Sequence, residues 1–246
     1  VLKSVCQVLF LMKISYTDLF IDFDDTLYDT HGNAILALSE LYEQCHLDQY
    51  FDKLEDFTIP YWEANVELWD LYSKGQITRD YLIVERFRRP LACGRIEPTR
   101  EYCLQISDLF LDLCACKPGV VEGAHEVMGY LRQKGYRLHM CSNGFHEVQY
   151  RKLQASRLLE YFDTIILSED AGANKPSKDF FDYAFAKTEA VRGKTLMIGD
   201  NYTTDILGAQ DSGVDVMFFN RHPDVFKTPG KVDYEIHSLK EIKDLL

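Results

Sequence analysis

The segment Asp22-Phe23-Asp24-Asp25-Thr26-Leu27 places two carboxylic acids two residues apart, directly after an apolar run. Side chains alternate along a β-strand, so we expect Asp22 and Asp24 to point the same way and to share one site. Like charges this close repel, and they are tolerated when a cation lies between them or when one remains protonated. The pattern also fits a helix N-cap in an exposed acidic turn, so alone it assigns no function.

Three later segments also place polar groups after apolar runs. Ser142 and Asn143 stand beside a glycine and offer a hydroxyl and main-chain N–H groups, which suit either phosphate oxygens or a simple turn. Lys175 precedes a proline that keeps the backbone extended and would aim the ammonium group, although a lone lysine is usually a solvated surface charge. Asp200 and Asp205 add two carboxylates at a predicted strand-to-helix turn, where Asp205 alone could be a simple first-turn helix residue.

Strands that alternate with helices are expected to position these residues. We expect a strand from Tyr16 into the Asp22 segment, strands at 136–141, 164–167, 195–198 and 214–219, and helices at 123–134, 148–159, 178–187 and 204–211. This alternation implies right-handed crossovers and a parallel sheet, whose ligands bind beyond the carboxyl ends of the strands. We therefore predict an α/β fold with a Rossmann-like parallel sheet of five strands, and one site shared by the four polar segments.

A long segment after the first strand breaks the alternation. It is rich in Leu, Tyr, Trp and Glu, and its apolar spacing predicts helices near 35–45, 62–69, 81–89 and 101–113. We expect a catalytic core formed by 1–30 and 118–246, and an all-helical insertion over 31–117. Residues 1–11 are expected to form a loose N-terminal extension, with Met12 as a candidate translation start.

Composition excludes several classes of protein. The chain has 246 residues and a formal net charge of −12, which opposes binding to a nucleic-acid polymer or an anionic membrane. Its first apolar stretch is too short to cross a bilayer. The seven cysteines are scattered without a C-x-x-C pair, so we expect neither a disulfide framework nor a zinc site and assign them to the core. A cytoplasmic monomer or weak homodimer is the expectation.

A candidate nucleophile, a hydroxyl, a lysine and an acidic pair thus occur in this order at the ends of four successive predicted strands. In this respect the sequence resembles a haloacid dehalogenase (HAD) superfamily phosphohydrolase with a helical cap, over about 16–246. Finer features resemble the pyrimidine 5′-nucleotidase branch, which acts on non-standard nucleoside monophosphates. These features are the segments 61–69, 75–78, 142–145 and 175–178.

The resemblance implies a covalent mechanism of phosphate-ester hydrolysis. Asp22 would attack phosphorus and form an aspartyl-phosphate, which splits hydrolysis into two displacements. Asp24 would protonate the leaving alkoxide and then accept a proton from the attacking water. Ser142, Asn143 and Lys175 would bind the phosphoryl oxygens.

The resemblance also implies a Mg²⁺ cofactor. Asp22, the main-chain carbonyl of Asp24, and Asp200 would bind the ion, with Asp205 acting through water. The metal would offset the repulsion between the phosphate ester and the attacking carboxylate.

The helical insertion is expected to close over the site and to select the leaving group. Asn65 and Trp69 lie four residues apart and share a helix face, where they would offer an amide for a base edge and a ring for stacking; Arg79 or Arg86 would approach a sugar or base oxygen. The expected partner is a small phosphate ester, preferably a pyrimidine nucleoside monophosphate. Alternatives are a sugar phosphatase or phosphomutase, a 2-haloacid dehalogenase and a non-enzymatic interaction protein.

Overall fold

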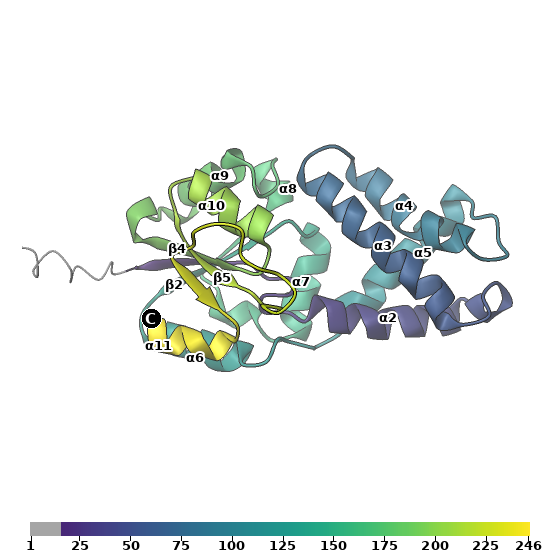
Figure 1. The fold of residues 1–246 in the computed structure, drawn as a ribbon, viewed down its shortest axis with the longest axis horizontal. Coiled ribbons are helices and arrows are strands. Elements are labelled where there is room, and N and C mark those ends of the chain that lie inside the picture. The colour runs from purple at the N-terminus through teal and green to yellow at the C-terminus, as the bar shows by residue number, and fades with distance from the viewer. Residues whose placement is uncertain (1–15) are drawn as a thin grey trace, which may run out of the picture.

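The computed structural model describes residues 16–246, so the expectations for 1–11 and Met12 lie outside the described residues. A parallel sheet runs through the core (Figure 1), and its strand order is β3-β2-β1-β4-β5-β6. The strands are β1 (Asp18–Ile21), β2 (Arg137–Ser142), β3 (Thr164–Leu167), β4 (Thr195–Gly199), β5 (Asp215–Phe219) and β6 (Tyr234–Ile236). The predicted parallel α/β fold is confirmed, and β1 lies in its interior between β2 and β4.

The sheet has six strands rather than the predicted five. The additional strand, β6, covers only three residues at the sheet edge, and only Ile236 among them is buried. So short a segment has too few alternating positions to produce a recognisable strand pattern.

Helices cover both faces of the sheet, and β1 shows the reason. Leu19 and Ile21 pack on one face against the helices at 124–133 and 242–245, whereas Phe20 packs on the other against the helices at 178–188 and 208–211, because side chains alternate along a strand. The core helices are α6 (Ala124–Gln133), α7 (His146–Ala155), α8 (Ser168–Ala171), α9 (Lys178–Thr188), α10 (Gly208–Asp211) and α11 (Ile242–Leu245), with a π-helix, η4, at Tyr202–Leu207. Short 3-10 helices lie at Leu47–Gln49, Leu159–Tyr161, Arg192–Lys194 and Leu239–Glu241.

The segment between β1 and α6 is helical and stands beside the sheet in Figure 1. Its helices, called here the cap helices, are α2 (Thr30–Gln44), α3 (Leu54–Ser73), α4 (Arg79–Ala92) and α5 (Arg100–Ala115). Thr78 and Thr99 accept hydrogen bonds from first-turn N–H groups and so begin α4 and α5. The cap helices bury their own apolar cluster, which includes Leu41, Phe57 and Phe87.

The two chain crossings between the core and the cap helices are tied together. The Tyr28 hydroxyl lies 2.8 Å from the Cys114 carbonyl oxygen and 2.9 Å from that of Lys117. The Asn33 amide exchanges two hydrogen bonds with the main chain of Gly119. These contacts join the start of α2 to the end of α5. Among the described residues, 16–246, no helix is both long and apolar enough to span a membrane.

Candidate active site

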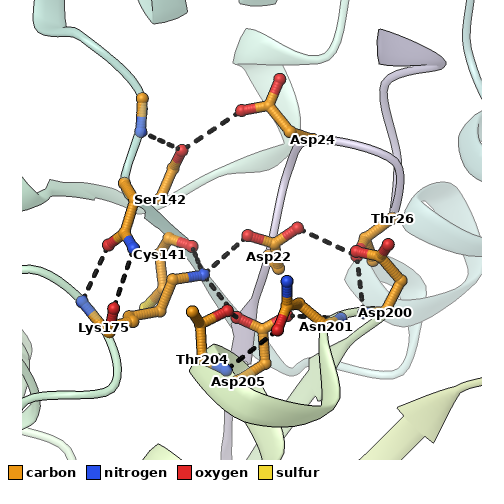
Figure 2. Close-up of polar contacts among 12 residues, drawn as sticks. Asp22, Asp24, Thr26, Cys141, Ser142, Lys175, Asp200, Asn201, Thr204 and Asp205 are labelled. Atoms are coloured by element: carbon orange, nitrogen blue, oxygen red, sulfur yellow. Dashed lines mark hydrogen bonds and ion pairs between the residues drawn. The ribbon is translucent and has the colours of Figure 1, made fainter. Parts of the chain in front are cut away.

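Asp22 follows β1 at the carboxyl edge of the sheet and meets a buried lysine there. The Nζ atom of Lys175 lies 2.6 Å from Asp22 Oδ1, 2.7 Å from Asp205 Oδ1 and 2.7 Å from the Cys141 carbonyl oxygen (Figure 2). All three ammonium hydrogens therefore have acceptors. Burial disfavours the charge on Lys175, but the two carboxylates outweigh burial and raise its pKa, so the ammonium group stays charged.

Asn143 orients this lysine through the main chain. Its Oδ1 atom accepts a hydrogen bond from the Lys175 N–H at 2.8 Å, and its Nδ2 donates to the Lys175 carbonyl oxygen at 2.9 Å. The sequence predicted phosphate binding for Asn143. Its side-chain amide holds the segment that carries the ammonium group, and phosphate binding by Asn143 through its main-chain N–H stays a prediction.

Three carboxylates gather beside Lys175. One oxygen each from Asp22, Asp200 and Asp205 lies within 4.8 Å of the others. The Thr26 hydroxyl lies 3.0 Å from both Asp22 Oδ2 and Asp200 Oδ1, yet it has a single hydrogen to donate. Three carboxylates therefore face one ammonium group and one hydroxyl donor, which leaves their negative charge poorly compensated.

The pKa values express this shortage of positive charge. Burial, and then the charge of Asp205, raise the pKa of Asp22 to about 7 against the opposing effect of Lys175. Burial and the charges of Asp22 and Asp205 also raise the pKa of Asp200 well above its usual range. Hard carboxylate oxygens with uncompensated charge are the ligands that Mg²⁺ prefers, so the donor set of Asp22, Asp200 and Asp205 fits that ion.

Asp24 does not join this carboxylate cluster. Its Oδ1 lies 2.6 Å from Lys152 Nζ and 2.6 Å from the Thr30 hydroxyl, and its Oδ2 lies 2.6 Å from Gln149 Nε2. The carboxylate points away from Asp22 in Figure 2, toward Ser142. Burial favours the neutral acid, but Lys152 and the hydrogen-bond donors outweigh burial and hold the pKa of Asp24 below its usual range.

That Asp22 and Asp24 share one site stays a prediction, because their carboxylates contact different lysines, Lys175 and Lys152. Strand β1 ends at Ile21, and the chain turns after Asp24, with Asp25 in the left-handed region at φ 60°. Metal binding through the main-chain carbonyl of Asp24 stays a prediction.

Gln149 and Lys152 are site residues that sequence reasoning missed. They lie three residues apart on α7, and both are buried. The signal was a pair of polar side chains on the apolar face of a predicted helix that also carries Val148 and Leu153. Such a pair indicates a buried polar partner, but only the tertiary structure identifies it as Asp24.

The cap residues predicted to contact substrate have separate locations. Trp69 lies on α3 and packs against Phe145 of the core, with ring centroids 5.5 Å apart. Trp62, two turns earlier, lies 4.4 Å from the His31 ring at the start of α2. Asn65 lies between these two contacts on the same side of α3, as the spacing predicted.

The two arginines do not approach the carboxylate cluster. Arg79 forms ion pairs with Glu147 and Glu169 of the core, and its guanidinium group lies 4.1 Å from the centroid of the Phe145 ring. Arg86 is buried inside the cap helices, where its Nη2 donates to the Ser107 hydroxyl at 3.3 Å. The structure therefore does not bring Arg86 to the site, because its guanidinium group packs over the aromatic rings of the cap interior.

The chain is similar over most of its length to named proteins. It is 32% identical over 234 residues to YfnB of Bacillus subtilis, which is described as a HAD-hydrolase, covering 94% of this chain and 95% of YfnB. It is 28% identical to the pyrimidine 5′-nucleotidase PynA of Streptococcus pneumoniae, covering 94% and 95%. It is 27% identical to the pyrimidine 5′-nucleotidase YjjG of Escherichia coli, covering 93% and 96%.

A solved structure of YfnB matches this fold with a TM-score of 0.84 at 30% identity, covering 94% of this chain and 99% of that chain. The YfnB crystal is described as bound to magnesium and as revealing interdomain movement. The family model for haloacid dehalogenase-like hydrolases matches residues 19–213, which include all four polar segments. These matches confirm the resemblance and the expectation of a hydrolytic enzyme. The chain belongs to the haloacid dehalogenase-like hydrolase family.

Proposed function

We propose that this hydrolase is a Mg²⁺-dependent phosphomonoesterase that acts through an aspartyl-phosphate on Asp22. The observation that carries the proposal is the buried arrangement of Lys175 between Asp22 and Asp205, with Asp200 alongside. When bound by the three carboxylates, Mg²⁺ would supply the positive charge that offsets repulsion between the carboxylate and the phosphate. Lys175 adds a second fixed positive charge beside Asp22 and orients the Asp22 carboxylate for attack.

The chain's own residues then carry the two displacements. An oxygen of Asp22 forms the bond to phosphorus as the bond to the ester oxygen breaks. Asp24, protonated in the complex because the negative charge of the bound phosphate ester opposes the effect of Lys152 on its pKa, gives its proton to the departing alkoxide. Asp24, now ionised, takes a proton from the water that attacks the aspartyl-phosphate, which regenerates both carboxyl groups and releases inorganic phosphate. The Ser142 hydroxyl, at the end of β2, and the Lys175 ammonium group, in the segment beyond β3, bind the phosphoryl oxygens of the substrate.

We further propose that the substrate is a pyrimidine nucleoside 5′-monophosphate, selected by a cap formed by residues 31–117. Two of the similar proteins are named pyrimidine 5′-nucleotidases. The face of α3 that carries Trp62, Asn65 and Trp69 runs between the first turn of α2 and Phe145 of the core. Two rings and an amide on that face would be offered to the leaving group of a bound nucleotide. A cytoplasmic location and a monomer or weak homodimer stay predictions.

Phosphate release from a panel of substrates tests this function. Uridine and thymidine 5′-monophosphates, with either ribose or deoxyribose, should be hydrolysed faster than purine nucleotides or glucose 6-phosphate. EDTA should abolish turnover, and Ca²⁺ should restore little of it because its larger, looser coordination misplaces the in-line geometry. A clear preference for the hexose phosphate would contradict the substrate assignment. Activity without a divalent metal, or halide release from 2-chloropropionate in place of phosphate release, would contradict the mechanism.

Asp22→Asn should fold normally and lose turnover, with Asp80→Asn on the exposed surface of α4 as the matched control. A beryllium fluoride adduct, a mimic of the aspartyl-phosphate, should form on Asp22 of the wild type and be absent from Asp22→Asn. An adduct on Asp24 or on a cysteine would contradict the assignment of the nucleophile.

A further inference from the structure

The helix that follows the Ser142 segment buries two polar side chains where a helix against a sheet ordinarily buries apolar ones. Gln149 is fully buried on α7, and Lys152 is only 9% exposed. Burying an amide and an ammonium group is unfavourable unless each finds a partner. Both find the same partner, which lies on another element of the fold.

That partner is the carboxyl group of Asp24, and each of its oxygens receives a donor from α7. Lys152 Nζ lies 2.6 Å from Oδ1, and Gln149 Nε2 lies 2.6 Å from Oδ2. Gln149 Nε2 also lies 2.6 Å from the Ser142 hydroxyl oxygen. Two donors on different oxygens fix both the direction and the plane of the carboxyl group, which a single contact would leave free to rotate.

The two buried lysines divide the acidic side chains of the site between them. Lys175 contacts Asp22 and Asp205, whereas Lys152 contacts Asp24. Without Lys152, Asp24 would keep only the neutral donors Thr30, Gln149 and Ser142, which hold a carboxylate less strongly than an ammonium group does. The carboxyl group would then be held less firmly in the position at which it can exchange a proton with the leaving group.

From this arrangement we propose that Lys152 and Gln149 are positioning residues, which hold the carboxyl group of Asp24 outside the carboxylate cluster and available to exchange a proton with the leaving group. The inference rests on the proposed function, because it assigns no role to α7 unless Asp24 is the general acid. It adds two residues that lie outside the four segments that carry the chemistry.

Two esters with different leaving groups test the inference. Thymidine 5′-monophosphate releases an alkoxide that needs a proton, whereas p-nitrophenyl phosphate releases a phenolate that leaves without one. Lys152→Met should lower kcat/KM for thymidine 5′-monophosphate by roughly 10²-fold, the cost of a misplaced catalytic group. For p-nitrophenyl phosphate it should change kcat/KM by less than about threefold, since general-acid catalysis contributes little there. Lys152→Arg should recover part of the loss, and Lys243→Met on α11 is the matched surface control.

A role in packing alone would lower kcat/KM for both esters equally, so an equal loss, or no loss, would overturn the inference. Gln149→Met keeps the side-chain volume and removes both amide donors. If Lys152→Met does not fold, as judged by circular dichroism, Gln149→Met tests the inference in its place. The deciding quantity is then the loss of kcat/KM for thymidine 5′-monophosphate divided by the loss for p-nitrophenyl phosphate. A wild-type enzyme that hydrolyses neither ester with Mg²⁺ would refute the proposed function itself, an outcome distinct from equal losses in the variants.

Discussion

Replacing Asp200 with asparagine should stabilise the fold when no metal is present. Oxygens of Asp22, Asp200 and Asp205 lie within 4.8 Å of one another. At an effective dielectric constant of about 20, two unit charges at that distance repel by about 3 kcal/mol. Protonation relieves part of this repulsion, because the pKa of Asp22 is raised to about 7 and that of Asp200 is also raised. Above pH 7 Asp22 is ionised and its share of that relief is lost, so at pH 8 we expect Asp200→Asn to raise the free energy of unfolding by about 2 kcal/mol.

The sign of the pH dependence follows from the same shift. The folded state holds the Asp22 proton more tightly than the unfolded chain, whose carboxyl has the ordinary pKa of 3.8. The stabilisation from that proton is present below pH 3.8 and is lost as the pH rises through about 7. The advantage of Asp200→Asn over the wild type should therefore be larger at pH 8 than at pH 5.5.

Urea unfolding in EDTA at these two pH values measures the effect, which corresponds to a rise in Tm of roughly 4–8 °C at pH 8. Asp80→Asn should change the free energy of unfolding by less than about 0.5 kcal/mol, because that carboxylate is exposed. Mg²⁺ at 100 times its Kd should stabilise the wild type by about 2.7 kcal/mol and the variant by less. An Asp200→Asn variant that is less stable than the wild type in EDTA at pH 8 would refute the reasoning.

Three further predictions concern the cap and the sheet. Arg79→Ala removes two partly exposed ion pairs and the contact with Phe145, so it should weaken cap–core association by about 1–2 kcal/mol; small-angle scattering should show a larger radius of gyration. Asn65→Ala or Trp69→Ala should change the order of nucleotides ranked by kcat/KM and should change kcat/KM for p-nitrophenyl phosphate less. An unchanged order would show that α3 does not determine substrate specificity. Burial lowers the pKa of His139, so the wild type should lose stability as the pH falls below about 6.5, where the unfolded imidazole takes up a proton. In His139→Gln that loss should diminish, as urea midpoints at pH 7.5 and 5.5 would show.

Local patterns predicted most of the fold. The strand expected at 164–167 matches β3 (Thr164–Leu167), and the helix expected at 178–187 matches α9 (Lys178–Thr188) within one residue. Both have buried apolar residues at regular spacing, which is a local property of the chain. The helix expected at 148–159 is displaced: α7 begins at His146 and ends at Ala155. Boundaries depend on capping and on packing with other elements, which the periodicity of one segment does not contain.

The sequence by itself predicted that Asp22, Ser142, Lys175 and Asp200 meet at one site. Asp22 and Asp200 follow β1 and β4, Ser142 ends β2, and Lys175 lies in the segment beyond β3, and parallel strands bring their carboxyl ends to one edge. That convergence depends on strand direction, which follows from the alternation of strands and helices, whereas the strand order is known only from the structure. Residue type and order were therefore sufficient to locate the carboxylate cluster.

Only the tertiary structure decided which of these groups pair. The sequence contains no signal that Lys152, 128 residues beyond Asp24, contacts its carboxylate, or that Arg79 contacts the core while Arg86 remains inside the cap. Such choices depend on side-chain direction and on the balance between burial and charge compensation within a few ångströms. Spacing along the chain specifies which elements form, but the pairing of buried charges is specified by how those elements pack in three dimensions.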